Sequence, residues 1–207
     1  MKRNVRMEQI GVLVSGRGSN LQALIDAELR KQLHATISVV ISNKSRALSV
    51  QRAKKAEIPT EIVTKLSFPD KEEFDRQIIR ILEKHNVSLV VLAGYTRMLT
   101  RHFVNKYRLR IINIHPSLLP TFKGLKAQWQ AVECGVRVSG CTTHFVTFEM
   151  DNGPIILQKA VPVFQDDTGE SLSERILPEE HRILVKSVNL YCEHKLSIDG
   201  KRVIIEE

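Results

Sequence analysis

The stretch Ile10-Gly11-Val12-Leu13-Val14-Ser15-Gly16-Arg17-Gly18-Ser19-Asn20-Leu21 joins a short apolar run to a glycine-rich turn and then to a helical pattern. The apolar run over residues 10–15 predicts a buried strand, and Leu21, Leu24 and Ile25 fall at helical spacing. A strand followed at once by a helix is the unit from which parallel α/β sheets are built. We therefore predict an open sheet that begins with this unit.

The same strand–helix rhythm continues along the chain. Apolar runs predict further strands at residues 37–41, 61–63, 87–92 and 109–112, with helices predicted between them at 47–57, 74–82 and 98–107. After Pro120 the pattern changes to longer, partly alternating strands at residues 142–148 and 155–163. A helix over residues 172–188 contains Pro178, which should break or kink it, and Asp199-Gly200 predicts a final hairpin.

These elements predict a single α/β domain over residues 1–207, built on a mostly parallel twisted sheet. Its Rossmann-like half covers about residues 8–100, and a half with mixed strands covers about residues 101–207. A hydrophobic fraction of 43% and a charged fraction of 26% are typical of globular proteins. The apolar run after the basic start at residues 1–6 is too short for a signal peptide or a membrane span.

Charge and cysteine content narrow the class of protein further. The net charge of +8 comes from dispersed lysines and arginines, so anionic small molecules are expected at least as much as nucleic acid. Cys134, Cys141 and Cys192 form no CxxC pattern. They predict reduced thiols in a cytoplasmic protein without a zinc site.

The strand near residue 112 ends in Asn113-Ile114-His115-Pro116-Ser117-Leu118-Leu119-Pro120. Because alternate residues of a strand share a face, Asn113 and His115 should project together, and Pro116 should end the strand at the ligand-binding edge of the sheet. An amide donor beside an imidazole suits the stabilisation of an oxyanion and the transfer of a proton. On these residues alone, a core histidine with a capping asparagine is the alternative.

The glycine-rich turn predicts an anion site. Gly16 and Gly18 allow the backbone to turn sharply, and Ser19 or Asn20 is expected to cap the helix, whose free N–H groups attract anions. Leu21 stands where a dinucleotide fingerprint has its third glycine, and no Gly-Lys-Ser/Thr follows as in a Walker loop. A turn with only a structural role is the alternative.

Asp151 and His144 lie in the second half of the chain. Asp151 precedes Asn152-Gly153-Pro154, so its side chain is expected either to bond its own backbone in a turn or to orient His115 and raise the pKa of that imidazole. Spacing does not decide between the two. His144 is expected to support Asp151 rather than to carry a proton, and no role is assigned to His34, His85, His102, His181 and His194.

Four segments, in this order, resemble the folate-dependent formyltransferases. They are Ser15-Gly16-Arg17-Gly18-Ser19-Asn20-Leu21, Ala93-Gly94-Tyr95-Thr96-Arg97-Met98-Leu99, the segment from Asn113 to Pro120, and the segment from Thr143 to Gln158 that contains Asp151-Asn152-Gly153-Pro154. The resemblance covers about residues 10–194. The glycine-rich loop and the chain length point to the glycinamide ribonucleotide formyltransferases in particular.

The resemblance implies transfer of the formyl group of 10-formyltetrahydrofolate to the amine of glycinamide ribonucleotide, in purine biosynthesis. It implies that the catalytic residues, which stabilise a tetrahedral intermediate and move protons, are Asn113, protonated His115 and Asp151. It implies that the phosphate and ribonucleotide are bound by Gly18, Ser19, Asn20 and Glu180. It implies a folate site formed by Arg97, Met98, Leu99, Val146 and Asp151, and a cis peptide at Leu119–Pro120.

The chain departs from the family pattern at Gln128 and Trp129, where a histidine and a polar or charged residue are common. Gln128 can form hydrogen bonds but cannot titrate, so a proton role near the active site is in doubt at that position. The alternatives are a formyltetrahydrofolate hydrolase and a non-enzymatic basic α/β module that binds nucleotides or nucleic acid. We expect small-molecule substrates, no metal, no nucleic-acid or membrane partner, and a monomer or weak homodimer.

Overall fold

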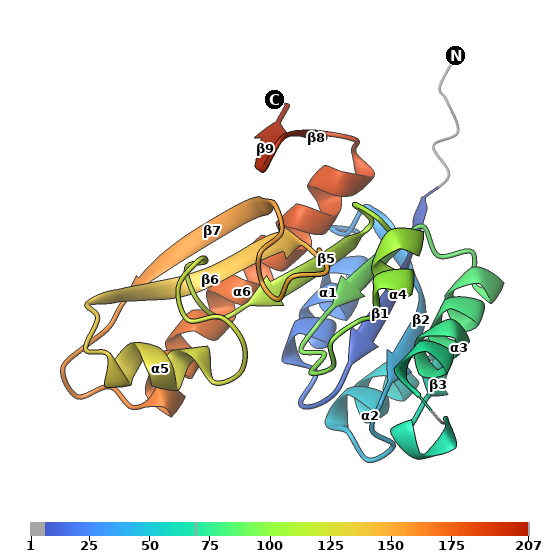
Figure 1. The fold of residues 1–207 in the computed structure, drawn as a ribbon, viewed down its shortest axis with the longest axis horizontal. Coiled ribbons are helices and arrows are strands. Elements are labelled where there is room, and N and C mark those ends of the chain that lie inside the picture. The colour runs from blue at the N-terminus through green and yellow to red at the C-terminus, as the bar shows by residue number, and fades with distance from the viewer. Residues whose placement is uncertain (1–6, 69, 207) are drawn as a thin grey trace.

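A nine-stranded sheet runs through the computed structural model, which describes residues 7–68 and 70–206 (Figure 1). The strand order is β3-β2-β1-β4-β5-β6-β7-β9-β8, so the strands of the first half of the chain lie at one end of the sheet and those of the second half at the other end. The basic start at residues 1–6 lies outside the described residues. The predicted α/β class with a Rossmann-like first half is confirmed.

The first half is a parallel sheet with helical crossovers. Adjacent strands are parallel among β1 (Glu8–Val14), β2 (Ala35–Ser42), β3 (Thr60–Ile62), β4 (Leu89–Leu92) and β5 (Ile111–His115). The connecting helices are α1 (Ser19–Leu29), α2 (Leu48–Lys55), the 3₁₀ turn η1 (Lys65–Ser67), α3 (Lys71–Lys84) and α4 (Arg101–Lys106). Helix α4 begins later than predicted, because the Thr100 hydroxyl accepts a hydrogen bond from Phe103 N–H and caps the helix there.

The second half reverses the direction of the sheet, as predicted. Strand β6 (Val138–Phe145) is antiparallel to β5, and β7 (Ile155–Pro162) is antiparallel to β6. Strands β8 (Leu196–Asp199) and β9 (Arg202–Ile205) form a hairpin with Gly200 at φ 60° in its turn. This hairpin joins the sheet through the pairing of β9 with β7. The strand predicted at 142–148 therefore begins earlier and ends at Phe145, and the helix α5 (Ala127–Glu133) was not predicted.

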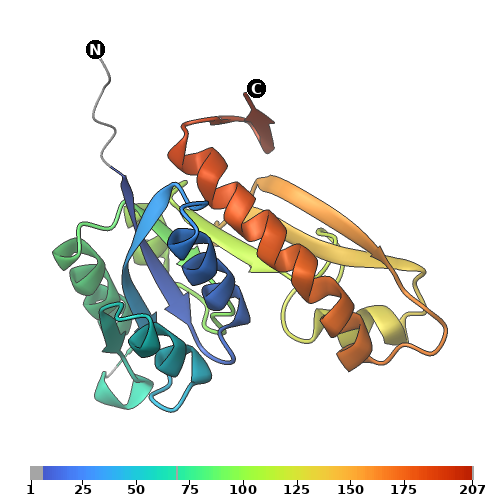
Figure 2. The same cartoon turned by 180° about the vertical axis from the view of Figure 1, so that it is seen from behind.

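Helix α6 (Gly169–Cys192) continues through Pro178, so the predicted break is wrong. Pro178 lies on the exposed side of the helix, where water can satisfy the carbonyl that loses its amide partner. The opposite side is buried along its length, through Leu172, Ile176, Ile183, Leu184 and Val188. Figure 2 shows α6 crossing the sheet beside α1. Burial of this long apolar face stabilises the helix despite the missing hydrogen bond.

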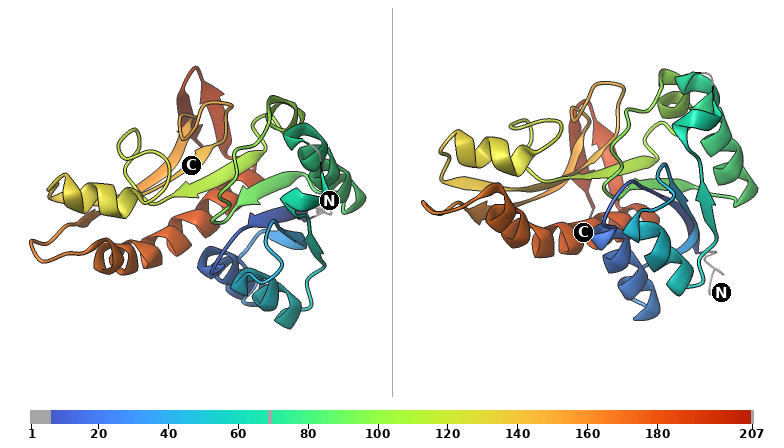
Figure 3. Two further views of the ribbon diagram at one scale, coloured as in Figure 1. Left: turned by 60° about the horizontal axis from the view of Figure 1, so that its bottom comes forward. Right: turned by 90° about the horizontal axis from the view of Figure 1, so that it is seen from below.

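Apolar side chains pack on both faces of the sheet. Leu24 of α1 and Leu184 of α6 pack in one cluster with Val12, and Phe74 of α3 and Phe103 of α4 pack in another with Leu13. Neighbouring strand residues point to opposite faces, which is why Val12 and Leu13 belong to different clusters. Figure 3 shows α1, α2 and α6 on one side of the sheet, with α3 and α4 on the other. These three layers fix the ends of β1, β4 and β5 next to one another.

A first prediction concerns the β6–β7 pair. Gly140 lies opposite Ala160, and a methyl group at Gly140 would overlap the carbonyl of Lys159 and lie 2.9 Å from Leu118 Cδ2. Gly140→Ala should therefore lower the free energy of unfolding by about 1–3 kcal/mol, measured by denaturant titration. Gly16→Ala is the control, since a methyl group there meets nothing within 4 Å. Equal stability of the two variants would contradict the prediction.

Candidate active site

Asn113 and His115 lie at the carboxyl end of β5, which ends at His115, before Pro116, as predicted. Asn113 pairs with His144 across the β5–β6 ladder, and its Nδ2 lies 3.1 Å from His144 Nε2. The side chains of His115 and His144 are 6% and 2% exposed. The antiparallel strand β6 therefore contributes a second imidazole to the pair that the sequence placed on β5.

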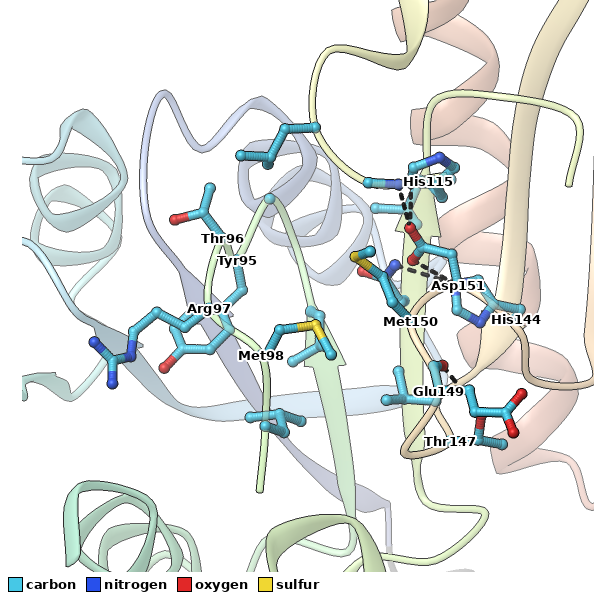
Figure 4. A pocket seen from close by; sticks show the side chains of 18 of the residues that line it. Tyr95, Thr96, Arg97, Met98, His115, His144, Thr147, Glu149, Met150 and Asp151 are labelled. Atoms are coloured by element: carbon cyan, nitrogen blue, oxygen red, sulfur yellow. Dashed lines mark hydrogen bonds and ion pairs between the residues drawn. The ribbon is translucent and has the colours of Figure 1, made fainter. Parts of the chain in front are cut away.

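Asp151 lies between the two imidazoles (Figure 4). Its Oδ2 is 3.4 Å from His115 Nδ1 and its Oδ1 is 3.6 Å from His144 Nε2. The Gly124 N–H donates a hydrogen bond of 2.9 Å to Oδ2. Asp151 lies in a turn with φ 47°, but its carboxylate contacts His115, His144 and the Gly124 N–H rather than the backbone of its own turn, so the geometry favours the orienting role.

The ring of His115 is held from both sides. Nε2–H donates a hydrogen bond of 2.8 Å to the Phe122 carbonyl, which leaves Nδ1 facing Asp151. Burial lowers the pKa of His115, whereas the Phe122 carbonyl and the Asp151 carboxylate act in the opposite direction and do not fully offset it. The Asp151 carboxylate thus acts on the pKa of His115 in the expected direction, while the larger effect of desolvation leaves that pKa below its ordinary value.

Both ring nitrogens of His115 face oxygen acceptors, and only the protonated ring can donate to both of them. Burial therefore lowers the pKa of this imidazole, whereas the two acceptors raise it. Negative charge on a group bound next to Nδ1 would favour the protonated form further. The site is arranged to give His115 a proton when such charge develops.

The carboxylate of Asp151 is ionised more readily than an ordinary aspartate. Burial alone would raise its pKa, but the contacts with His144, the Gly124 N–H and His115 outweigh burial and lower it. His144 is held on both sides of its ring: Nδ1 lies 3.0 Å from the Phe145 carbonyl, and Nε2 lies 3.1 Å from Asn113 Nδ2 and 3.6 Å from Asp151 Oδ1. His144 therefore contacts both Asn113 and Asp151.

A pocket of about 380 Å³ opens in front of Asp151. Asn113, His115 and His144 line this pocket. Its lining also includes all the residues predicted to bind folate, which are Arg97, Met98, Leu99, Val146 and Asp151. Met98 and Met150 are each 50% exposed and line opposite walls (Figure 4). The guanidinium of Arg97 points away from Asp151 and lies over the Phe74 ring, 4.0 Å from its centroid. Arg97 therefore forms the wall through its backbone and side-chain stem.

The predicted phosphate turn lies at the start of α1. Gly18 is the N-cap at φ 72°, and α1 has no side-chain cap, so the expectation that Ser19 or Asn20 caps the helix is wrong. A side chain at Gly18 would lie 2.6 Å from Ser49 Cβ, so only glycine fits there. Ser15 connects this turn to the pocket wall, because its Oγ accepts a hydrogen bond of 3.0 Å from Thr96 N–H. The start of α1, which lacks a side-chain cap, is thus linked to the pocket wall at Thr96.

Asn20 instead reaches across to α6. Its Nδ2 donates a hydrogen bond of 3.2 Å to Glu180 Oε2, and both side chains are buried, while Asn20 Oδ1 has no hydrogen-bond partner. Burial raises the pKa of Glu180 to about 7, although the Asn20 contact acts in the opposite direction. The structure therefore brings together two of the predicted ribonucleotide residues from opposite ends of the chain.

Sequence reasoning missed several features of the site. The Phe122 carbonyl and the Gly124 N–H are backbone groups, so the residue types at these positions do not indicate their contacts with His115 and Asp151. Both residues come shortly before Gln128, where the chain departs from the family pattern. Gln128 itself is on α5 and does not line the pocket. His181, to which no role was given, follows Glu180 on α6 and has a buried Nε2 without a hydrogen-bond partner. Leu119–Pro120 is cis, as expected.

Two features are absent from residues 7–68 and 70–206. None of the helices there has the combination of length and apolar character that a membrane crossing requires. No cluster of three or more histidine, cysteine, aspartate or glutamate side chains in that part of the chain is arranged to hold a metal ion.

Comparison with known proteins identifies the family. The model of the formyl transferase family matches residues 8–188, so the chain belongs to this family. It is 40% identical over 201 residues to phosphoribosylglycinamide formyltransferase of Escherichia coli, covering 94% of this chain and 95% of that protein. It is 46% identical to the trifunctional purine biosynthetic protein adenosine-3 of Homo sapiens over 96% of this chain, and spans only 20% of that protein.

Solved structures agree with the sequence comparison. The crystal structure of glycinamide ribonucleotide transformylase 1 from Symbiobacterium toebii superimposes with a TM-score of 0.96 at 46% identity, covering 97% of this chain and 95% of that one. The fold is therefore shared along nearly the whole chain, including the segments that carry Asn113, His115 and Asp151.

A second prediction follows from Glu180. Because burial raises its pKa from 4.5 to about 7, the folded protein holds this proton more tightly than the unfolded chain. The resulting stability is present below pH 4.5 and is lost as the pH rises to about 7, a loss of about 3 kcal/mol from this group. Glu180→Gln cannot titrate, so between pH 5 and pH 8 it should gain stability relative to the wild type in denaturant titrations.

Glu174→Gln, on the exposed side of α6, is the matched control and should keep the pH dependence of the wild type. An identical pH dependence in Glu180→Gln and the wild type would show that Glu180 does not titrate in this range.

Proposed function

We propose that this protein transfers the formyl group of 10-formyltetrahydrofolate to the amine of glycinamide ribonucleotide, a step of purine biosynthesis. The observation that supports this most directly is the cluster of Asp151, His115, His144 and Asn113 in one pocket, whose wall at Thr96 is hydrogen-bonded to Ser15 before the start of α1. The names of the relatives point to the same reaction. We further propose a cytoplasmic enzyme, a monomer or weak homodimer, that requires no metal.

His115 and Asn113 are suited to the oxyanion that forms when the amine attacks the formyl carbon. The Phe122 carbonyl fixes the orientation of the imidazole, so Nδ1 faces Asp151, and both residues line the pocket. As charge develops on the formyl oxygen, Nδ1–H and the Asn113 amide can donate to it. Asp151, which is ionised and adjacent, stabilises the protonated imidazole that makes this hydrogen bond, and it can accept a proton from the attacking amine through water.

The two substrates have separate places in this proposal. The pocket wall at residues 97–99 and the segment at 146–151 suit the flat pterin of the folate, with the two methionines adapting to the faces of its ring. Gly18, Ser19 and Asn20 at the start of α1 suit the phosphate, and Glu180 suits the ribose hydroxyls. Holding both substrates converts the attack into an effectively unimolecular step.

The third prediction distinguishes a transferase from a hydrolase. Consumption of 10-formyltetrahydrofolate, followed spectroscopically, should be slow alone and rise by a factor of about 10² or more when glycinamide ribonucleotide is added. The formyl group should be recovered on the ribonucleotide amine. An analogue without the phosphate should restore little of this rate. Rapid formate release that ignores the ribonucleotide would instead identify a hydrolase.

The fourth prediction separates catalysis from binding. Asp151→Asn should reduce kcat by a factor of about 10² or more, because an amide cannot stabilise the imidazolium or accept a proton. It should also shift the fall of activity at high pH to lower pH, since the Asp151 carboxylate raises the pKa of His115. Ser19→Ala should mainly raise KM for the ribonucleotide. Equal losses of ribonucleotide affinity in both variants would contradict this division.

A further inference from the structure

Helix α5 has a small contact surface for the position it holds. Only Ala127 and Ala131 among its seven residues are buried, and alanine side chains provide little apolar area. Val132 adds a partly buried contact with the core. The large apolar side chain of the helix is Trp129, which is 40% exposed. The position of α5 therefore depends on what the covered part of the indole contacts.

Trp129 lies against the first residue of α6. A methyl group at Gly169 would lie 2.5 Å from both Cγ and Cε2 of the indole, so the ring packs directly on the glycine backbone. Thr168 and Ser171 form a capping box that fixes this first turn of α6. The contact thus joins α5 to a rigid part of the fold, and it requires glycine at position 169.

The segment before α5 carries the two backbone groups that contact the catalytic side chains. The Phe122 carbonyl accepts from His115, and the Gly124 N–H donates to Asp151. Phe122 and Lys126 have φ values of 49° and 57°, conformations that a non-glycine residue keeps only when its surroundings impose them. Contacts with residues outside this segment must therefore hold its backbone in place.

Helix α5 is one of the supports of this segment. The Gln130 amide, one residue after Trp129, donates a hydrogen bond of 2.9 Å to the Leu125 carbonyl and a longer one to the Lys123 carbonyl. Contacts therefore lead without interruption from Gly169 through Trp129 and Gln130 to the backbone beside His115 and Asp151.

We propose that Trp129 is a positioning residue for His115 and Asp151. Its contact with Gly169 holds α5 in place, and α5 in turn holds the backbone of residues 122–126 against these two side chains. The kinetic part of this inference rests on the proposed formyl transfer. Trp129 is also the only tryptophan of the chain, so its fluorescence reports on this contact independently of activity.

Gly169→Ala tests the proposal in the wild-type background. The added methyl group should displace the indole, shift the Trp129 emission to longer wavelength and reduce kcat by a factor of about 10 to 100. The fall of activity at high pH should move to lower pH, because the Phe122 carbonyl raises the pKa of His115. Trp129→Ala should have the same kinetic effects, and Trp129→Phe, which keeps a ring, should restore much of the activity.

A double-mutant cycle separates the contact from any general effect of alanine at position 169. Once Trp129→Ala has removed the ring, adding Gly169→Ala should cost no further activity or stability, because alanine is the better helix former. Ile78→Val, on the buried face of α3, is the control for a modest loss of stability and should keep the kcat and pH profile of the wild type.

Two results would overturn the proposal. One is a Trp129→Ala variant with wild-type kcat and pH profile; the other is equal damage from Gly169→Ala with and without the indole. Failure of the proposed function is a distinct result: the wild type itself would then transfer no formyl group to the ribonucleotide, while the fluorescence shift and the stability cycle would still report whether Trp129 sits on Gly169.

Discussion

The placement of one ionised carboxylate between two buried imidazoles is the constraint on which the rest of the site depends. Asp151 contacts His115 and His144 at 3.4 and 3.6 Å, and its stabilisation in a buried position requires partners from several elements. Strand β5 supplies one imidazole, β6 the other, and the segment before α5 supplies the Gly124 N–H. The change from parallel to antiparallel pairing between β5 and β6 sets these groups opposite one another.

Much of the fold could be predicted because buried strands have a strong apolar signal. The runs at β1, β2 and β4 are almost continuous, and Pro116 marks the end of β5 at the correct residue. Helix α5 could not be found in the same way, since its buried face consists of Ala127 and Ala131 and has no apolar period. The predicted break at Pro178 was wrong for a different reason. Proline has a low helix propensity, but the packing of α6 against the sheet outweighs that cost.

The candidate site was predictable in its side chains and not in its backbone. The types and spacing of Asn113 and His115 indicated oxyanion and proton chemistry, and the family resemblance selected the catalytic role for Asp151 and added Glu180. The Phe122 carbonyl leaves no trace in residue type, yet it determines which nitrogen of His115 faces Asp151. The cap expected from Asn20 failed because its amide bonds to a carboxylate 160 positions away, a contact that local pattern cannot foresee.

That same contact has a consequence for how the protein is made. Strands β1, β2, β4 and β5 can pair while the ribosome is still translating, because their partners are already available. The carboxylate that meets Asn20 belongs to α6 and leaves the ribosome only after some 160 further residues. A nascent chain can therefore pair most of its strands before Asn20 meets Glu180. Translation of α6 supplies both the buried face that covers one side of the sheet and the carboxylate that completes this contact.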